Sequence, residues 1–137
     1  MNVKLYFLLF FLIIGTYGCY IFYINYALSK SIKRLDIDSA TGLIKGIGPF
    51  EFKKGDTGAL MIHGYTGTSR EMLPLARYLS ERNISSYGIL LPGHGSTPRE
   101  LKKTTKEDWY RAAENELKRM KKEYKTVYIV EIGRAHV

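Results

Sequence analysis

The residues of this chain that could take part in chemistry are few and lie in two glycine-containing turns. The first turn is His63-Gly64-Tyr65-Thr66-Gly67, and the second is Leu91-Pro92-Gly93-His94-Gly95. A histidine can act as a general base near neutral pH. We interpret His63 and His94 instead as structural residues whose imidazoles hold the turns by hydrogen bonds. Neither they nor His136 are joined by a cluster of Cys, Asp or Glu, so we predict no metal site and no cofactor.

The first turn follows a strand and precedes a helix. Residues 59–62 are continuously apolar, which is typical of a strand buried on both faces. Residues 69–82 have the spacing of a helix, with Thr68 or Ser69 as its cap and Pro74 in its first turn. One face of this helix is apolar, formed by Met72, Leu75, Ala76 and Leu79. In a parallel sheet, ligands bind at the carboxyl ends of the strands, and the turn lies at such an end.

The rest of the chain continues the alternation of strands and helices. We expect a short strand within 48–52, a turn over 53–58, a strand over 84–91 and a loop over 91–98. Thr105 and Asp108 form a capping box for a helix over 106–122, and a further buried strand follows over 127–130. The helix has an apolar stripe in which we interpret Trp109 as a core residue. The predicted fold class is α/β, with a mostly parallel sheet and helices on both faces.

Residues 5–28 carry no charged side chain and predict a transmembrane helix. A helix over these residues would be about 36 Å long, enough for a hydrocarbon core of about 30 Å. We therefore expect a membrane anchor with its flanking charges over residues 1–35, and the lipid bilayer as a partner. Two alternatives are a cleaved signal peptide, with a marginal site at 27–29, and a lipoprotein signal ending at Cys19. Lys30, Lys33 and Arg34 follow the segment, which favours a cytoplasmic C-terminal domain by the positive-inside rule, with an anchored extracellular or secreted domain as the alternative.

Net charge is +8, with one cysteine in the chain. The Lys and Arg residues of 99–125 are interpreted as the solvated face of a helix, with attraction to anionic lipid as the alternative. No nucleic-acid-binding motif accompanies the charge, so we expect no nucleic-acid partner. Cys19 lies in the apolar segment and excludes an internal disulfide framework.

The first turn, in this context, resembles the oxyanion-hole turn of the α/β-hydrolase fold. The resemblance is to bacterial carboxylesterases and monoacylglycerol lipases, grouped with the serine aminopeptidase-like hydrolases, and runs from about residue 48 to residue 130. The matching pieces are 49–50, 63–67, 72–76, 91–95, 107–109 and 127–130. It implies that the backbone N–H of Tyr65 is one oxyanion-hole donor, with His63, Gly64, Thr66 and Gly67 as the supporting turn.

The nucleophile that this family needs is missing from the sequence. Its serine lies in a Gly-x-Ser-x-Gly turn directly after the strand matched here by 127–130, and its acid and histidine come later. This chain instead continues as Glu131-Ile132-Gly133-Arg134-Ala135-His136-Val137. We interpret 131–137 as a non-native tail, because the heptapeptide resembles the translation of a sequencing adapter. A divergent native end is the alternative. Residues 36–130 would then be the N-terminal half of the sheet.

The resemblance implies a membrane-anchored serine hydrolase of carboxylic esters, such as monoacylglycerols or short acyl esters. Its Ser-His-Asp triad would lie beyond this chain, so we expect no catalytic residue and no activity in residues 1–137. Alternatives are a secreted esterase with a cleaved signal peptide, a peptidase or epoxide hydrolase of the same fold, and a membrane-tethered interaction module without chemistry.

Overall fold

The computed structural model describes residues 3–132, which form two units divided between Asp36 and Ile37. The first unit contains one helix, α1 (Val3–Ile32), whose residues 5–28 carry no charged side chain and no proline. Residues Tyr6–Ile32 are long and apolar enough to cross a membrane. Its large apolar side chains are exposed within the unit. The helix predicted over residues 5–28 is therefore confirmed, and it extends a few residues further at each end.

The second unit is built on a sheet of four strands. These are β1 (Phe50–Phe52), β2 (Thr57–Ile62), β3 (Ile84–Gly88) and β4 (Thr126–Glu131), in the order β1-β3-β2-β4. Strand β2 lies parallel to both β3 and β4, and only β1 runs antiparallel to its neighbour. The mostly parallel sheet is thus confirmed, with β2 in its interior.

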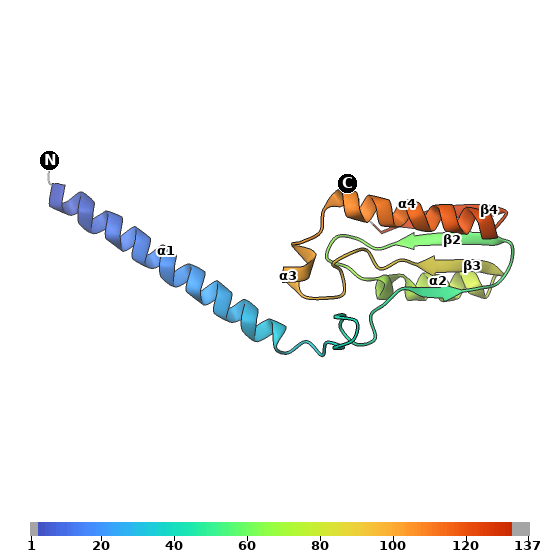
Figure 1. The fold of residues 1–137 in the computed structure, drawn as a ribbon, viewed down its shortest axis with the longest axis horizontal. Coiled ribbons are helices and arrows are strands. Elements are labelled where there is room, and N and C mark those ends of the chain that lie inside the picture. The colour runs from blue at the N-terminus through green and yellow to red at the C-terminus, as the bar shows by residue number, and fades with distance from the viewer. Residues whose placement is uncertain (1–2, 133–137) are drawn as a thin grey trace. The chain divides into compact units, whose positions relative to one another are not determined.

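Helices cover both faces of this sheet (Figure 1). The chain after β2 forms a 3-10 turn, η1 (Ser69–Met72), and then α2 (Leu73–Ser80). After β3 come the short α3 (Pro98–Leu101) and the long α4 (Lys106–Glu123). Alternate residues of β2 face opposite sides: Met61 packs with Met72 and Ala76 on the α2 side, and Leu60 packs with Met120 on the α4 side.

The predicted helix caps are partly confirmed. The Thr105 Oγ1 accepts a hydrogen bond from the Asp108 N–H at 3.3 Å, and the Asp108 carboxylate accepts one from the Thr105 N–H at 2.9 Å. This capping box begins α4 where the sequence predicts it. Thr68 caps the 3-10 turn, and Pro74 stands in the first turn of α2.

Several predicted boundaries and faces were wrong. The turn expected over 53–58 is shorter, because β2 begins at Thr57. Gly58 belongs to the strand, where an added Cβ would meet the Tyr124 ring at 2.8 Å. The strand expected over 84–91 ends at Gly88, although Ile89 still donates its N–H to the Met61 carbonyl at 3.1 Å. Leu75 is exposed, since the 3-10 turn shifts the helix face.

The loop expected over 91–98 contains the start of α3, which sequence periodicity did not predict. Thr97 caps it by accepting a hydrogen bond from the Glu100 N–H at 3.3 Å, and Pro98 occupies the first turn. A four-residue helix is too short to show a periodic apolar face.

Strand β4 was expected to be a further buried strand, and this expected burial was wrong. Tyr128 is 60% exposed and Ile129 is 56% exposed, whereas Val127 and Val130 are half-buried. The physical reason is position, because β4 is an edge of the described sheet and pairs with β2 alone.

Strand β4 was expected to end at Val130, and in the structure it extends by one residue. Glu131 belongs to β4, and Ile132 donates its N–H to the Ile62 carbonyl at 3.1 Å, so the pairing with β2 continues past Val130. Residues 133–137, the remainder of the predicted tail, lie outside the described residues.

Candidate functional site

The turn after β2 presents an unpartnered backbone donor. The Gly67 N–H donates to the Gly64 carbonyl at 3.0 Å, and Thr66 takes a left-handed conformation with φ of 63°. Within residues 3–132, the Tyr65 N–H donates to no acceptor. The Tyr65 side chain is 72% exposed. A backbone N–H without a partner at the carboxyl end of a parallel sheet is available to a ligand.

His63 is 2% exposed, and both of its ring nitrogens bond to the backbone. Its Nε2 lies 3.1 Å from the Leu91 amide nitrogen, which can only donate, so Nε2 is the acceptor. The proton of the neutral ring is then on Nδ1, which donates to the Gly64 carbonyl at 3.0 Å. Burial lowers the pKa of His63, as does His94 to a lesser degree, while the bond to Gly64 raises it. A neutral ring with both nitrogens bonded has no lone pair free for proton transfer.

His94 is 3% exposed and lies beside His63, with the ring centroids 4.8 Å apart. Its Nδ1 lies 3.2 Å from the Pro92 carbonyl and therefore carries the proton. Its Nε2 is buried and has no hydrogen-bond partner among the described residues. The two histidines are thus held differently, one at both nitrogens and one at a single nitrogen.

Trp109 connects the second turn to α4. Its indole N–H donates to the Pro92 carbonyl and to the Thr104 Oγ1, each at 3.0 Å. Its ring lies 5.1 Å from His94 and 5.7 Å from Tyr65, between centroids. Trp109 also packs against the Leu60 cluster, as the sequence predicts. The hydrogen bonds were not predicted, although a half-buried indole N–H generally needs an acceptor.

These residues line one cavity of about 360 Å³ at the carboxyl end of the sheet. Its walls are mainly apolar, from the ends of β2 and β4, the turn over 91–94 and α4. The lining residues are Ile62, His63, Gly64, Tyr65, Leu91, His94, Trp109, Tyr110, Ala113, Ile129 and Glu131. An apolar cavity of this size with few polar groups is typical of small-molecule sites.

The end of β4 closely approaches the first turn. A Cβ added to Gly64 would meet the Ile132 carbonyl oxygen at 2.8 Å, so the backbone contact requires glycine. Ile132 therefore lies beside the Gly64–Tyr65 peptide.

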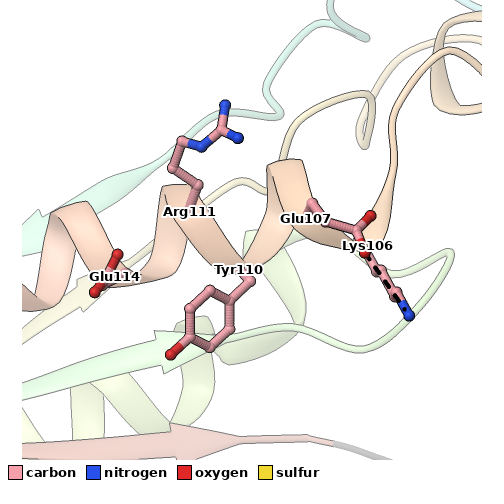
Figure 2. Close-up of a pocket in the computed structure, with 5 residues that line it drawn as sticks. All are labelled: Lys106, Glu107, Tyr110, Arg111 and Glu114. Atoms are coloured by element: carbon pink, nitrogen blue, oxygen red, sulfur yellow. Dashed lines mark ion pairs between the residues drawn. The ribbon is translucent and has the colours of Figure 1, made fainter.

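A second hollow runs along α4 and is lined by Lys106, Glu107, Tyr110, Arg111 and Glu114 (Figure 2). Figure 2 shows Tyr110 and Arg111 leaving the helix on opposite sides. Lys106 and Glu107 form an exposed ion pair at 3.7 Å, which is a weak interaction in water. Only Tyr110 is shared with the cavity at the carboxyl end, and we assign no chemistry to this hollow.

Comparisons with known proteins agree with this architecture, although no family model matches the chain. A solved structure of a metagenome-derived lipolytic enzyme superposes with a TM-score of 0.63 at 23% identity, covering 66% of this chain and 37% of that one. This chain has the α/β-hydrolase fold.

Two curated hydrolases of the esterase and lipase family resemble the chain in sequence. A carboxylesterase of Bacillus subtilis (strain 168) is 43% identical over 63 residues, which is 46% of this chain and 26% of the relative. A thermostable monoacylglycerol lipase of Bacillus sp. (strain H-257) is 31% identical over 90 residues, 64% of this chain and 35% of the relative. The chain therefore spans about a quarter to a third of these α/β-hydrolases.

Proposed function

We propose that residues 1–137 are the N-terminal part of a membrane-anchored serine hydrolase that cleaves carboxylic esters, such as monoacylglycerols or short acyl esters. The observation that carries the proposal is the Tyr65 N–H, which has no partner within residues 3–132 and lies beside the end of β4. The partial coverage of both ester-hydrolase relatives supports a longer parent protein.

In the proposed mechanism, Tyr65 N–H is one of two oxyanion-hole donors. A serine in a tight turn after β4 would attack the ester carbonyl, a histidine would take the serine proton, and a carboxylate would orient that histidine. Negative charge develops on the carbonyl oxygen, and the Tyr65 N–H would donate a hydrogen bond to it. Loss of one such donor typically costs roughly 2.7–4 kcal/mol of transition-state stabilisation. The serine, histidine and acid would lie beyond residue 137, so residues 1–137 would be inactive.

His63, Gly64, Thr66 and Gly67 would support the donor without taking part in chemistry. His63 has no free ring nitrogen, and glycine at 64 is required by the contact with the Ile132 carbonyl.

The test of the hydrolase is the parent reading frame, expressed and assayed with p-nitrophenyl acyl esters. We expect a Gly-x-Ser-x-Gly turn after β4 and turnover that is lost when its serine becomes alanine. Tyr65→Phe should retain most activity because the donor is backbone, whereas Tyr65→Pro should abolish activity because the N–H is removed. Equal damage from both variants would assign the role to the Tyr65 hydroxyl and contradict the proposal.

The proposed anchor is α1, of which 27 residues, Tyr6–Ile32, are apolar enough to span a bilayer. At 1.5 Å per residue this segment is about 40 Å long, against a hydrocarbon core of about 30 Å. The full-length protein should remain in the membrane fraction after alkaline carbonate washing. Release as a shortened soluble protein would indicate a cleaved signal peptide instead.

A further inference from the structure

We propose that Trp109 is a positioning residue for the Gly64–Tyr65 peptide, and that it acts through the second turn and His63. The inference rests on the proposed function, because the peptide that it positions carries the Tyr65 N–H.

The connection between α4 and the first turn consists of hydrogen bonds of ordinary length, one of them buried and the others partly buried. The Trp109 indole N–H donates a hydrogen bond to the Pro92 carbonyl at 3.0 Å, and His94 Nδ1 donates to the same oxygen at 3.2 Å. Pro92 is covalently next to Leu91, whose N–H donates to His63 Nε2 at 3.1 Å. His63 Nδ1 then donates to the Gly64 carbonyl at 3.0 Å. Two side chains therefore connect a long helix to the turn after β2.

The end of this connection decides where the Tyr65 N–H points. The Gly64 carbonyl and the Tyr65 N–H belong to one planar peptide, and no cis peptide bond occurs in the described chain. In a trans peptide, the carbonyl oxygen and the amide hydrogen point in opposite directions. Because His63 holds the oxygen on the buried side, the N–H is directed away from it. Rotation of this peptide would turn the donor away and present a carbonyl oxygen to the developing oxyanion.

The turn has little else to fix this peptide. Its internal hydrogen bond, from Gly67 N–H to the Gly64 oxygen at 3.0 Å, moves with the turn and does not attach it to the sheet. The Tyr65 ring lies 5.7 Å from the Trp109 ring and 6.3 Å from the His94 ring, between centroids, but these contacts involve the exposed side chain and make no hydrogen bond to the peptide. Glycine at 64 also lacks the Cβ that restricts backbone rotation. Among the described residues, the bond from the His63 ring, which Leu91 holds in place, is thus the one hydrogen bond that links this peptide to the second turn.

The test uses the parent hydrolase with Trp109→Phe, which keeps a ring in the same place and removes the indole N–H. We expect kcat to fall about tenfold to a hundredfold with KM changed less than about twofold, because a donor displaced by a fraction of an ångström loses mainly transition-state binding. Thr104→Val is the matched control, since it removes the other acceptor of the same indole N–H and leaves the bond to Pro92. We expect its kcat to stay within about twofold of wild type.

A second measurement tests the link from Trp109 to the Gly64–Tyr65 peptide without an activity assay. In residues 1–137 in detergent micelles, Trp109→Phe should speed hydrogen exchange of the Leu91 N–H and shift the Tyr65 amide resonance. Thr104→Val should do neither. If Trp109→Phe leaves kcat and the Tyr65 amide unchanged while the wild-type enzyme is active, the inference fails and the proposed function stands. Equal kcat losses in both variants would indicate general loosening and also overturn it. A parent protein that hydrolyses no ester would overturn the proposed function and the inference with it.

Discussion

Strands β2 and β4 are neighbours with similar apolar sequences and different surroundings. Residues 59–62 of β2 read Ala-Leu-Met-Ile, and residues 127–130 of β4 read Val-Tyr-Ile-Val. Leu60 and Met61 are completely buried, whereas Tyr128 and Ile129 are more than half exposed. The difference arises because β2 has a strand on each side and a helix over each face, and β4 has one neighbouring strand. An apolar run therefore predicts a strand, but its burial depends on what is packed beside it.

The two strands should differ most in the free energy of unfolding that is lost when a buried side chain of β2 or an exposed side chain of β4 is truncated. Leu60→Ala should destabilise the second unit by about 2–5 kcal/mol, because it leaves a cavity between β2 and α4. Ile129→Ala should cost less than about 1 kcal/mol, because its side chain is largely hydrated already. Urea unfolding of the full chain in micelles, followed by fluorescence of Trp109, the single tryptophan, measures both. Equal losses would show that β4 is as buried as β2.

The exposed edge should promote association. An apolar edge strand with unpaired backbone groups recruits other chains, and a lysine on it opposes this. Tyr128→Lys should therefore lower the concentration-dependent association of the chain, measured by light scattering. Tyr78→Lys, on helix α2 with a similarly exposed ring, is the control and should change association little. If both lysines act alike, net charge and not the strand edge controls association.

The carboxyl end of β2 should make stability depend on pH through His63. Burial lowers its pKa in the folded chain below the ordinary value of 6.5. The unfolded chain then binds the proton more readily, so the stabilising contribution is present above the unfolded pKa and is lost as the pH falls through the folded pKa. Urea midpoints should decrease between about pH 7 and pH 5, and His63→Leu should flatten this part of the profile. A wild-type midpoint constant over this range would contradict the neutral ring described here.

The smallest effect is expected at the other end of the same two strands. Lys125, before β4, and Asp56, before β2, form an ion pair between exposed side chains. Such pairs in water add little to stability because solvent and salt screen them. Lys125→Ala should leave the urea midpoint unchanged within error. A clear loss would mean that the ion pair, and not the backbone ladder, sets the register of β2 and β4.

Most of the fold could be predicted because local chemistry dictates it. The uncharged segment predicts α1, and the Thr105–Asp108 capping box predicts the start of α4. The apolar run before Gly64 predicts the interior strand. The element boundaries were predicted wrongly where a residue type is compatible with two kinds of secondary structure. Gly58 serves a strand as well as a turn, since the close approach of Tyr124 requires a residue without a Cβ.

The candidate site was predicted only in part. The Tyr65 turn was placed at the carboxyl end of the sheet by its position after an apolar run. The indole hydrogen bond of Trp109 to Pro92, and the bond of Leu91 to His63, join residues 17 and 28 positions apart. Neither separation carries a periodic signal, so neither contact could be inferred from spacing.

The donor role of Tyr65 is only what the family resemblance implies. The sequence by itself determined the alternation of strands and helices apart from α3, the apolar N-terminal helix and the glycine-containing turn after the interior strand. These follow from periodicity, capping residues and glycine, whose effects act within a few positions along the chain. The tertiary structure alone decided that Tyr128 and Ile129 are exposed while Leu60 and Met61 are buried, which backbone groups bond to the two ring nitrogens of His63, and that Trp109 is linked to the Gly64–Tyr65 peptide. Those properties depend on which distant segments lie side by side, because burial and hydrogen bonding are set by neighbours in space.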